Sequence, residues 1–278
     1  MKICIIGNGY WGKIIEKNLY NLGYSEIKII DKVLNNYHEL TDEFDYYFIA
    51  TPFSTHKSIL NDLSNFSEKR IWSEKPLVES LDSAKTIYAQ LEENGNMLFV
   101  DWTYTFNPCI FYLRDELSDK KIKQIVLNRT NSGPIREDTS SIFDLSSHDL
   151  SIIYFIFGND ILDFSWNEFS LSKNKNTGSN LSWAYSNGMQ IIINSSWEHD
   201  AKNRVSFIVT KDNGIIIFDD EKKIIIDEAG RQLDFSRHES PLNSAIKFFF
   251  ESENFENNKK LTLAITKTLD NARHKYEI

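Results

Sequence analysis

The feature that most constrains the fold of this chain is a glycine motif near its start, Gly7-Asn8-Gly9-Tyr10-Trp11-Gly12. An apolar run, Lys2-Ile3-Cys4-Ile5-Ile6, precedes the motif, and its length suits a buried parallel strand and not a helix. A helical pattern follows and ends at Gly23, with apolar positions at Ile14, Ile15, Leu19 and Leu22. The motif therefore lies where a strand turns into a helix.

Each glycine has its own physical role in such a turn. Gly7 permits the tight turn, Gly9 lets the backbone approach a pyrophosphate, and Gly12 lets the helix pack on the strand. The helix start then offers its N–H groups to the phosphates. We therefore predict that residues 7–12 bind a dinucleotide. The alternative is a glycine-rich turn without a ligand.

Asp31 ends the second predicted strand, residues 27–31. A carboxylate there accepts hydrogen bonds from both ribose hydroxyls of NAD and repels a 2′-phosphate, so NAD is favoured over NADP. Neighbouring Lys32 can soften that preference, and the alternative for Asp31 is an ordinary surface turn residue. Too few residues separate Asp31 from Asp45 for a full helical crossover, so we expect this crossover to be abbreviated.

The remaining pattern predicts an α/β protein of two domains, since 278 residues exceed the usual size of a single domain. Strands and helices alternate in residues 1–108, which indicates a doubly wound parallel sheet. After Pro108 consecutive strands dominate, with hairpin turns at 186–188 and 212–214, so residues 109–278 are expected to form an α+β domain. A last helix at about 259–274 is expected near the domain junction. The other predicted elements are strands 45–50, 69–73, 97–101, 122–130, 161–172, 180–185, 189–197, 203–210, 214–219 and 222–227, and helices 12–22, 55–63, 80–93, 109–117 and 144–157.

Composition excludes several functional classes. The net charge of −9 and the lack of a dense basic run disfavour nucleic-acid binding. Cys4 and Cys109 form neither a disulfide framework nor a metal motif, so we expect two reduced core residues. The first strand begins at residue 2 and no apolar run approaches the roughly 20 residues that span a bilayer, so we expect a cytoplasmic protein with no membrane partner.

Two loops follow buried strands and are expected at the carboxyl edge of the parallel sheet, where cofactors bind. In the first loop Thr51, Pro52 and His56 are candidate cofactor contacts, and His56 fits a cap or packing role better than a catalytic one. The second loop holds Glu74 and Lys75, both candidate cofactor contacts. A lysine beside a nicotinamide can stabilise charge on a substrate oxygen, whereas the alternative is a surface lysine.

Asp144 and His148 are spaced four residues apart on one predicted helix and therefore share a face. Histidine titrates near neutral pH, so this pair suits proton transfer to or from a substrate hydroxyl. The alternative is a capping aspartate with a buried structural histidine. Asp149 fits a structural partner, and we predict no metal site because the segment offers no third ligand at metal spacing.

Together these motifs resemble the glucose-fructose oxidoreductase, inositol 2-dehydrogenase and rhizopine-catabolism family (Gfo/Idh/MocA). The likeness spans nearly the whole chain and is closest to the branch with Gly-Tyr-Trp-Gly in the phosphate loop, which includes enzymes of nucleotide-sugar and surface-polysaccharide pathways. Further matching segments are Tyr104-Thr105-Phe106-Asn107-Pro108, Gly133-Pro134-Ile135-Arg136, Asp144 to Ile152, Ser196-Trp197 and Phe218-Asp219-Asp220.

The resemblance implies an N-terminal Rossmann domain and a C-terminal domain with a large, mostly antiparallel sheet. The open face of that sheet commonly forms a homodimer or homotetramer interface in the family. It also implies that Lys75, Asp144 and His148 are the catalytic set, with His148 as acid/base and Lys75 assisting at the substrate oxygen. Tyr104 belongs to a matching segment and is a candidate substrate contact.

The resulting hypothesis is an NAD-dependent oxidoreductase that moves hydride between a sugar CH–OH carbon, preferably of a nucleotide-linked sugar, and the nicotinamide. The alternatives are a dehydrogenase of free sugars or inositols and a catalytically silent dinucleotide-binding regulator. Four basic residues are candidates to bind a carboxylate or diphosphate, with ordinary surface charge as the alternative: Arg129, Arg136, Lys202 and Arg204.

Overall fold

The structure is a computed structural model that describes residues 1–170 and 176–273 and divides into two compact units. Unit 1 comprises Met1–Asp101 and Leu242–Ile278, and unit 2 comprises Trp102–Pro241. The boundary therefore lies at 101/102 where the sequence suggested 108/109. The C-terminal segment belongs to unit 1 and not, as the strand pattern predicts, to the second domain.

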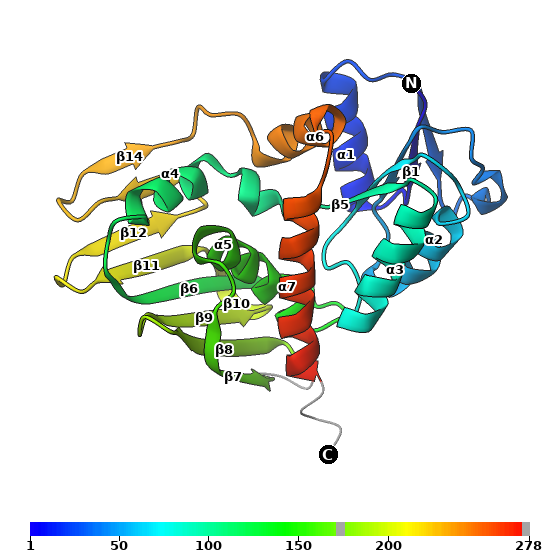
Figure 1. Cartoon of the computed structure of the whole chain (residues 1–278). Helices are drawn as coiled ribbons and strands as arrows, with labels where there is room; N and C mark the ends of the chain where they lie inside the picture. Colours follow the sequence, from blue (N-terminus) through cyan, green and yellow to red (C-terminus); the bar gives the residue numbers. More distant parts are fainter. Residues whose placement is uncertain (171–175, 274–278) are drawn as a thin grey trace. The chain divides into compact units, whose positions relative to one another are not determined.

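Unit 1 is built on a five-stranded parallel sheet in the order β2-β1-β3-β4-β5 (Figure 1). Each strand has only four residues, and β1, the strand between β2 and β3, is buried along its whole length. This confirms the predicted doubly wound sheet. The strands are β1 (Ile3–Ile6), β2 (Ile27–Ile30), β3 (Tyr46–Ile49), β4 (Arg70–Ser73) and β5 (Met97–Val100).

The strand order places the helices of unit 1 on both faces of its sheet. The chain runs one way from β1 to β2 and the other way from β3 to β5, so right-handed crossovers put α1 (Tyr10–Asn21) opposite α2 (His56–Leu63) and α3 (Leu81–Glu93). The abbreviated crossover is confirmed, because residues 31–45 contain only a 3₁₀ turn, Tyr37–Glu39. Asn36 closes this segment by accepting from the Asp31 N–H at 2.8 Å and donating to the Ile29 carbonyl at 2.9 Å.

Two C-terminal helices complete unit 1, and α6 (Pro241–Glu251) was not predicted from the sequence. Its Phe249 packs against Phe48, Trp72 and Phe99 of the sheet. The second helix, α7 (Glu256–Arg273), contacts β5 and α3, and its Asn258 side chain exchanges two 2.8 Å hydrogen bonds with the Val100 backbone. These contacts explain why the last residues belong to unit 1.

Unit 2 is built on a nine-stranded, mostly antiparallel sheet in the order β14-β13-β12-β11-β6-β9-β8-β7, with β10 paired to β6. The two predicted hairpins are present, and within the described part of this sheet β6 and β9 are the one parallel pair. The short strands β10 and β14 were not predicted, and residues 171 and 172 of the predicted strand 161–172 lie outside the described residues. The strands are β6 (Ile122–Ser132), β7 (Ile161–Phe169), β8 (Gly178–Tyr185), β9 (Gln190–Ser196), β10 (Glu198–Asn203), β11 (Val205–Thr210), β12 (Ile215–Asp219), β13 (Ile224–Ile226) and β14 (Gln232–Asp234).

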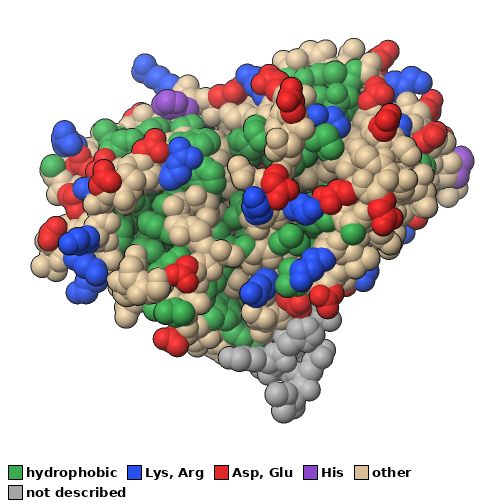
Figure 2. Space-filling model, in the orientation of Figure 1, with side chains coloured by type: hydrophobic (Ala, Val, Ile, Leu, Met, Phe, Trp, Pro, Cys, Tyr) green, Lys and Arg blue, Asp and Glu red, His purple; other side chains and the backbone are tan. Residues whose placement is uncertain are grey.

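The two faces of this sheet differ. One face carries the buried residues Leu127, Ile191 and Ile193 and is covered by α4 (Pro108–Leu117) and α5 (Ser147–Phe157) (Figure 1). On the opposite face Phe207 and Ile215 are 38% and 52% exposed. Figure 2 shows hydrophobic side chains at the surface between interspersed acidic and basic ones. Within residues 1–170 and 176–273, no helix combines the length and apolar character needed to cross a membrane.

Candidate active site

The glycine motif forms a loop in which two glycines are required by packing and one faces open space. Gly7 has φ +111°, and a Cβ there would lie 2.5 Å from the Ala50 carbonyl oxygen. A Cβ on Gly12 would lie 2.0 Å from the Gly7 carbonyl oxygen, whereas a Cβ on Gly9 would meet nothing within 4 Å. Gly9 is therefore the position where a ligand can approach the backbone.

The first turn of α1 also fits an anionic ligand. Gly9 is its N-cap residue, so no side chain caps the helix, and the first turn holds no acidic residue. The N–H groups at this end therefore keep their preference for an anion. The exposed rings of Tyr10 and Trp11 meet edge to face at 5.8 Å beside this end. Residues 7–12 thus fit the phosphates of a dinucleotide.

Asp31 is tied to the glycine loop by its carboxylate. Oδ2 accepts from the Asn8 N–H at 2.6 Å, and Oδ1 accepts from the Val33 N–H at 2.6 Å. Each carboxylate oxygen retains a second lone pair that can accept from a ribose hydroxyl. The side chain is therefore held at the carboxyl end of β2, where a dinucleotide fold recognises its ribose.

His56 joins the two loops that follow β3 and β4. The side chain is 1% exposed, with Nε2 3.1 Å from the Thr51 carbonyl oxygen and Nδ1 3.0 Å from the Pro76 carbonyl oxygen. Thr51 is also fixed by Thr55, whose hydroxyl donates to Thr51 Oγ1 at 2.8 Å. His56 thus holds the loop that contains Thr51 and Pro52 in shape. Its own side chain is buried beneath that loop.

Glu74 and Asp101 place two buried carboxyl groups at the ends of β4 and β5, with Lys75 directly after Glu74. Glu74 is 8% exposed and Asp101 is 1% exposed. Burial and the neighbouring Asp101 raise the pKa of Glu74 to about 8, against the opposing effect of Lys75. Lys75, which is half-buried, therefore lies beside a buried carboxyl group whose protonated form is favoured.

In unit 2 a π-helical turn, Ile142–Ser146, leads into α5 and carries Asp144 one turn before His148. Asp144 Oδ2 accepts from Trp197 Nε1 and from Arg136 Nε, each at 3.2 Å. Ser146 anchors this turn to the sheet, because its hydroxyl lies 2.9 Å from that of Ser195 on β9. The two predicted proton-transfer residues are thus brought to one end of α5.

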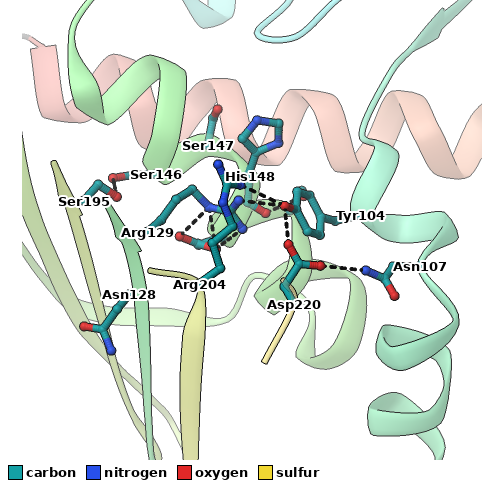
Figure 3. A network of polar contacts seen from close by, with 12 residues as sticks. Tyr104, Asn107, Asn128, Arg129, Ser146, Ser147, His148, Ser195, Arg204 and Asp220 are labelled. Atoms are coloured by element: carbon teal, nitrogen blue, oxygen red, sulfur yellow. Dashed lines mark hydrogen bonds and ion pairs between the residues drawn. The ribbon is translucent and has the colours of Figure 1, made fainter. Parts of the chain in front are cut away.

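Arg129 and Tyr104 are the centre of a polar cluster behind His148 (Figure 3). Arg129 is 3% exposed, and its Nε and Nη2 donate to the Asp149 carboxylate at 3.0 and 2.6 Å. Although burial opposes it, Asp149 holds the pKa of Arg129 above its ordinary value. Arg129 Nη1 donates to the Tyr104 hydroxyl at 2.8 Å, as does Arg204 Nη1 at 3.1 Å. The Arg129 guanidinium is therefore used inside the protein.

The four basic candidates occupy different settings. Arg204 is half-buried and also donates to Asn131 Oδ1 at 3.2 Å, and Lys202 lies 3.6 Å from the Glu221 carboxylate on the surface. Arg136 is 44% exposed and pairs with Asp144 through Nε alone at 3.2 Å. Its two terminal nitrogens make no hydrogen bond to the described residues. Arg136 is thus the candidate with donors directed to solvent near Asp144.

Asp220 and Asn107 belong to the cluster although the sequence assigned them no role. Asp220 Oδ2 accepts from the Tyr104 hydroxyl at 2.8 Å, and Asp220 Oδ1 accepts from Asn107 Nδ2 at 3.1 Å. Both lie in segments that carried the family resemblance, which is the one sequence signal that marks them. Across residues 1–170 and 176–273, no group of three or more His, Cys, Asp or Glu is placed to hold a metal ion.

Comparisons with known proteins identify relatives of this chain. Residues 25–102 match the Gfo/Idh/MocA oxidoreductase family with an NAD-binding Rossmann fold. The uncharacterized oxidoreductase YrbE of Bacillus subtilis strain 168 is 24% identical in an alignment of 195 residues, and the match covers 57% of this chain. That match spans 54% of YrbE, or about half of its length.

Solved structures share the fold over nearly the whole chain. The UDP-N-acetylglucosamine 3-dehydrogenase GnnA of Acidithiobacillus ferrooxidans has a TM-score of 0.82 at 18% identity, over 98% of this chain and 97% of that one. A mutant of the 3-ketoreductase KijD10 of Actinomadura kijaniata, solved with TDP-benzene and NADP, has a TM-score of 0.80 at 14% identity, with 98% and 97% covered. These structures show a shared fold, and the family match over residues 25–102 is to oxidoreductases with an NAD-binding Rossmann fold.

Proposed function

We propose that the chain is a Gfo/Idh/MocA oxidoreductase that transfers hydride between a CH–OH carbon of a nucleotide-linked sugar and NAD. The proposal rests on the presence of two features in one chain. Unit 1 has an uncapped α1 start with open space at Gly9, and unit 2 holds Asp144 and His148 at one end of α5. When NAD is bound it accepts or returns the hydride.

Proton transfer is assigned to the side chains. His148 takes the hydroxyl proton as hydride leaves the same carbon and returns it in the reverse direction. Asp144 orients the substrate or the imidazole from one turn earlier, and Lys75 stabilises charge on the reacting oxygen. The glycine loop and Asp31 hold the dinucleotide, so these residues need only position and exchange a proton.

The preference for a nucleotide-linked sugar rests on Arg136. A diphosphate offers several anionic oxygens, and an exposed guanidinium with two uncommitted terminal nitrogens can bind them in bidentate fashion. Because Arg136 already contacts Asp144, such a ligand would lie close to the proposed proton-transfer pair. GnnA is a UDP-N-acetylglucosamine 3-dehydrogenase and the KijD10 structure holds a TDP group, so UDP- and TDP-linked sugars are the first set to assay.

The test compares each UDP- or TDP-linked sugar with its free sugar, using reduction of bound NAD as the readout. Arg136→Gln should lower the ratio of kcat/KM for the linked sugar over the free sugar by about tenfold or more, since a charge-assisted contact is lost. Arg231→Gln, which affects an exposed arginine paired with Asp227, is the matched control. An equal loss for both sugars would favour a free-sugar or inositol dehydrogenase, and no turnover with any sugar would favour a silent regulator.

We also propose a homodimer or homotetramer assembled through the open face of the unit 2 sheet. By register Phe207 lies between Val126 and Ile217, and exposed Ile215 adjoins them on β12. An apolar face of this kind is normally covered in the functional protein. Light scattering of the wild type should exceed the 32.4 kDa of one chain, and Phe207→Glu should shift it toward that mass. A monomeric wild type at micromolar concentration contradicts this assembly.

A further inference from the structure

The Tyr104 hydroxyl is fully used by contacts inside unit 2. It receives hydrogen bonds from Arg129 and Arg204 and donates its single proton to Asp220 (Figure 3). A phenol has one donor and two acceptor sites, so these three contacts exhaust it. Burial raises the pKa of Tyr104 above its ordinary value, although Arg129 opposes this effect. The hydroxyl therefore stays protonated and has no site left for a substrate.

The Tyr104 ring, in contrast, touches the proposed acid/base. Its centroid lies 5.2 Å from that of the His148 imidazole, with the planes at 69°. The Arg129 guanidinium carbon lies 4.5 Å from the centroid of the Tyr104 ring. Edge-to-face pairs at this separation have a preferred geometry, so the position of the phenol ring restricts the rotation of the imidazole.

These contacts connect His148 to Arg129 by two routes. Asp149 follows His148 in α5, its carboxylate binds Arg129, Arg129 binds Tyr104, and the Tyr104 ring returns to the imidazole. The backbone and the ring of His148 are thus tied to the same buried guanidinium. Two arginines and two aspartates, Arg129, Arg204, Asp149 and Asp220, leave the cluster formally neutral.

We propose that Tyr104 and the Arg129–Asp149 pair are positioning residues that fix the His148 imidazole for proton transfer, and that they do not bind the substrate. This role deepens the proposed function and rests on His148 being the acid/base. It replaces the direct substrate contact expected for Tyr104 and Arg129 from the sequence. The operative part of Tyr104 is its ring, while its hydroxyl holds the ring in place.

The test substitutes Tyr104 in two ways and observes His148 directly. Tyr104→Leu removes the ring, whereas Tyr104→Phe keeps the ring and removes the hydroxyl. In the protein without substrate, long-range ¹H–¹⁵N spectra report the ring nitrogens of His148. Tyr104→Leu should shift or broaden these signals and lower kcat by about tenfold to a hundredfold with KM unchanged, because a small misplacement of a catalytic group is costly. Tyr104→Phe should restore kcat to within about threefold of the wild type, the scale of one hydrogen bond.

Tyr112→Leu and Tyr112→Phe form the matched control set, since Tyr112 is a half-buried tyrosine on α4 whose ring packs on Phe235. They should reproduce any loss of melting temperature without moving the His148 signals or kcat. If Tyr104→Leu does not fold, Tyr104→Met replaces it, because it also removes the ring and leaves a longer apolar side chain in its place. That variant should move the same signals in the same direction.

Unchanged His148 signals in Tyr104→Leu, or in Tyr104→Met where it stands in, overturn the proposal. It is also overturned if Tyr104→Phe and Tyr104→Leu lower kcat equally, since the hydroxyl would then be the operative group. A rise in KM with kcat unchanged would return Tyr104 to substrate binding. Failure of the proposed function has a different signature, because His148→Asn would then leave turnover unaffected while the spectra of the Tyr104 variants could still change.

Discussion

The cofactor loop of unit 1 is formed mainly by backbone groups, whereas the polar cluster of unit 2 is formed by side chains. The loop uses backbone: Gly7 and Gly12 are needed because a Cβ would collide with carbonyl groups, and the start of α1 offers N–H groups. The cluster uses side chains: Arg129 and Asp149 satisfy each other almost out of contact with water, and half-buried Tyr104 bonds to Arg129. A backbone site depends on one contiguous segment, whereas the cluster depends on the whole fold of unit 2.

The difference has an energetic consequence. Substitution in the loop changes local geometry or ligand approach, but substitution in the cluster can leave a buried charge without its partner. A buried ion pair contributes little net stability as a pair, yet removing one partner is strongly destabilising. The two regions should therefore respond to single substitutions differently: every loop substitution should change cofactor affinity, whereas the main effect in the cluster should be on stability.

The largest expected effect is on the Arg129–Asp149 pair. Asp149→Asn should lower the free energy of unfolding by about 3–5 kcal/mol, because the Arg129 charge stays buried without compensation. Urea denaturation measures the change. Glu43→Gln, which breaks the exposed 3.2 Å pair with Lys2, should cost no more than about 1 kcal/mol. A loss below about 1 kcal/mol in Asp149→Asn would contradict the description of the pair as buried and mutually dependent.

Buried Glu74 should make the stability of unit 1 depend on pH. Its pKa of about 8 in the fold exceeds the ordinary 4.5, so the protonated form is favoured and its stability contribution is complete below about pH 4.5. The contribution is lost as the pH rises through about 8, with a slope of at most about 1.4 kcal/mol per pH unit.

Glu74→Gln keeps a neutral side chain at every pH and should flatten the decline in stability between pH 4.5 and 8. Chemical denaturation at several pH values tests this, with the exposed Glu93→Gln on α3 as the matched substitution. An identical pH dependence in wild type and Glu74→Gln would show that Glu74 is ionised in the fold.

Two glycines of one loop should separate packing from ligand binding. Gly9→Ala adds a Cβ into open space at an ordinary negative φ of −76°, so folding should be unchanged while NAD binds about tenfold more weakly. Gly12→Ala places its Cβ 2.0 Å from the Gly7 carbonyl oxygen and should lower both melting temperature and NAD affinity. Calorimetry with a thermal melt distinguishes the two, and normal NAD affinity in Gly9→Ala would remove the phosphates from this position.

The smallest effect concerns Asp31 and the choice of dinucleotide. NAD should bind at least about tenfold more tightly than NADP, or roughly 1.4 kcal/mol, because the fixed carboxylate repels a 2′-phosphate. Asp31→Asn should bring the two affinities together by fluorescence titration. Equal affinities in the wild type would assign the choice to the short segment after Asp31, including Lys32.

The contrast between the regions also explains what could be predicted from the sequence. The loop was predicted because its three glycines lie within six consecutive residues and each has a local backbone role. Strand order and hairpins followed from apolar runs and from turns such as Asp212-Asn213-Gly214. The helix α6 was not predicted, because the consecutive residues Phe248, Phe249 and Phe250 obscure a one-sided apolar face. The polar strand β10 has no apolar alternation to reveal it.

The cluster could be predicted only in part. The spacing of Asp144 and His148 is local, and it placed both at one end of α5 as expected. Arg129 and its partner Asp149 are 20 residues apart in the sequence, and Tyr104 and its partner Asp220 are 116 residues apart. These partners can therefore be identified only from the fold. From the sequence, Arg129 and Arg136 were therefore equal candidates for binding an anion. In the fold Arg129 forms an internal ion pair, whereas Arg136 is exposed to solvent.

The central claim, hydride transfer with His148 as acid/base and Lys75 at the reacting oxygen, is tested by single-turnover reduction of bound NAD across pH. Lys75→Met and His148→Asn should each slow this step by about 100-fold or more, with NAD affinity and melting temperature nearly unchanged. His148→Asn should also lose the pH-dependent limb near neutrality. Normal turnover with a lowered melting temperature in both variants would assign the two residues to structure and contradict the mechanism.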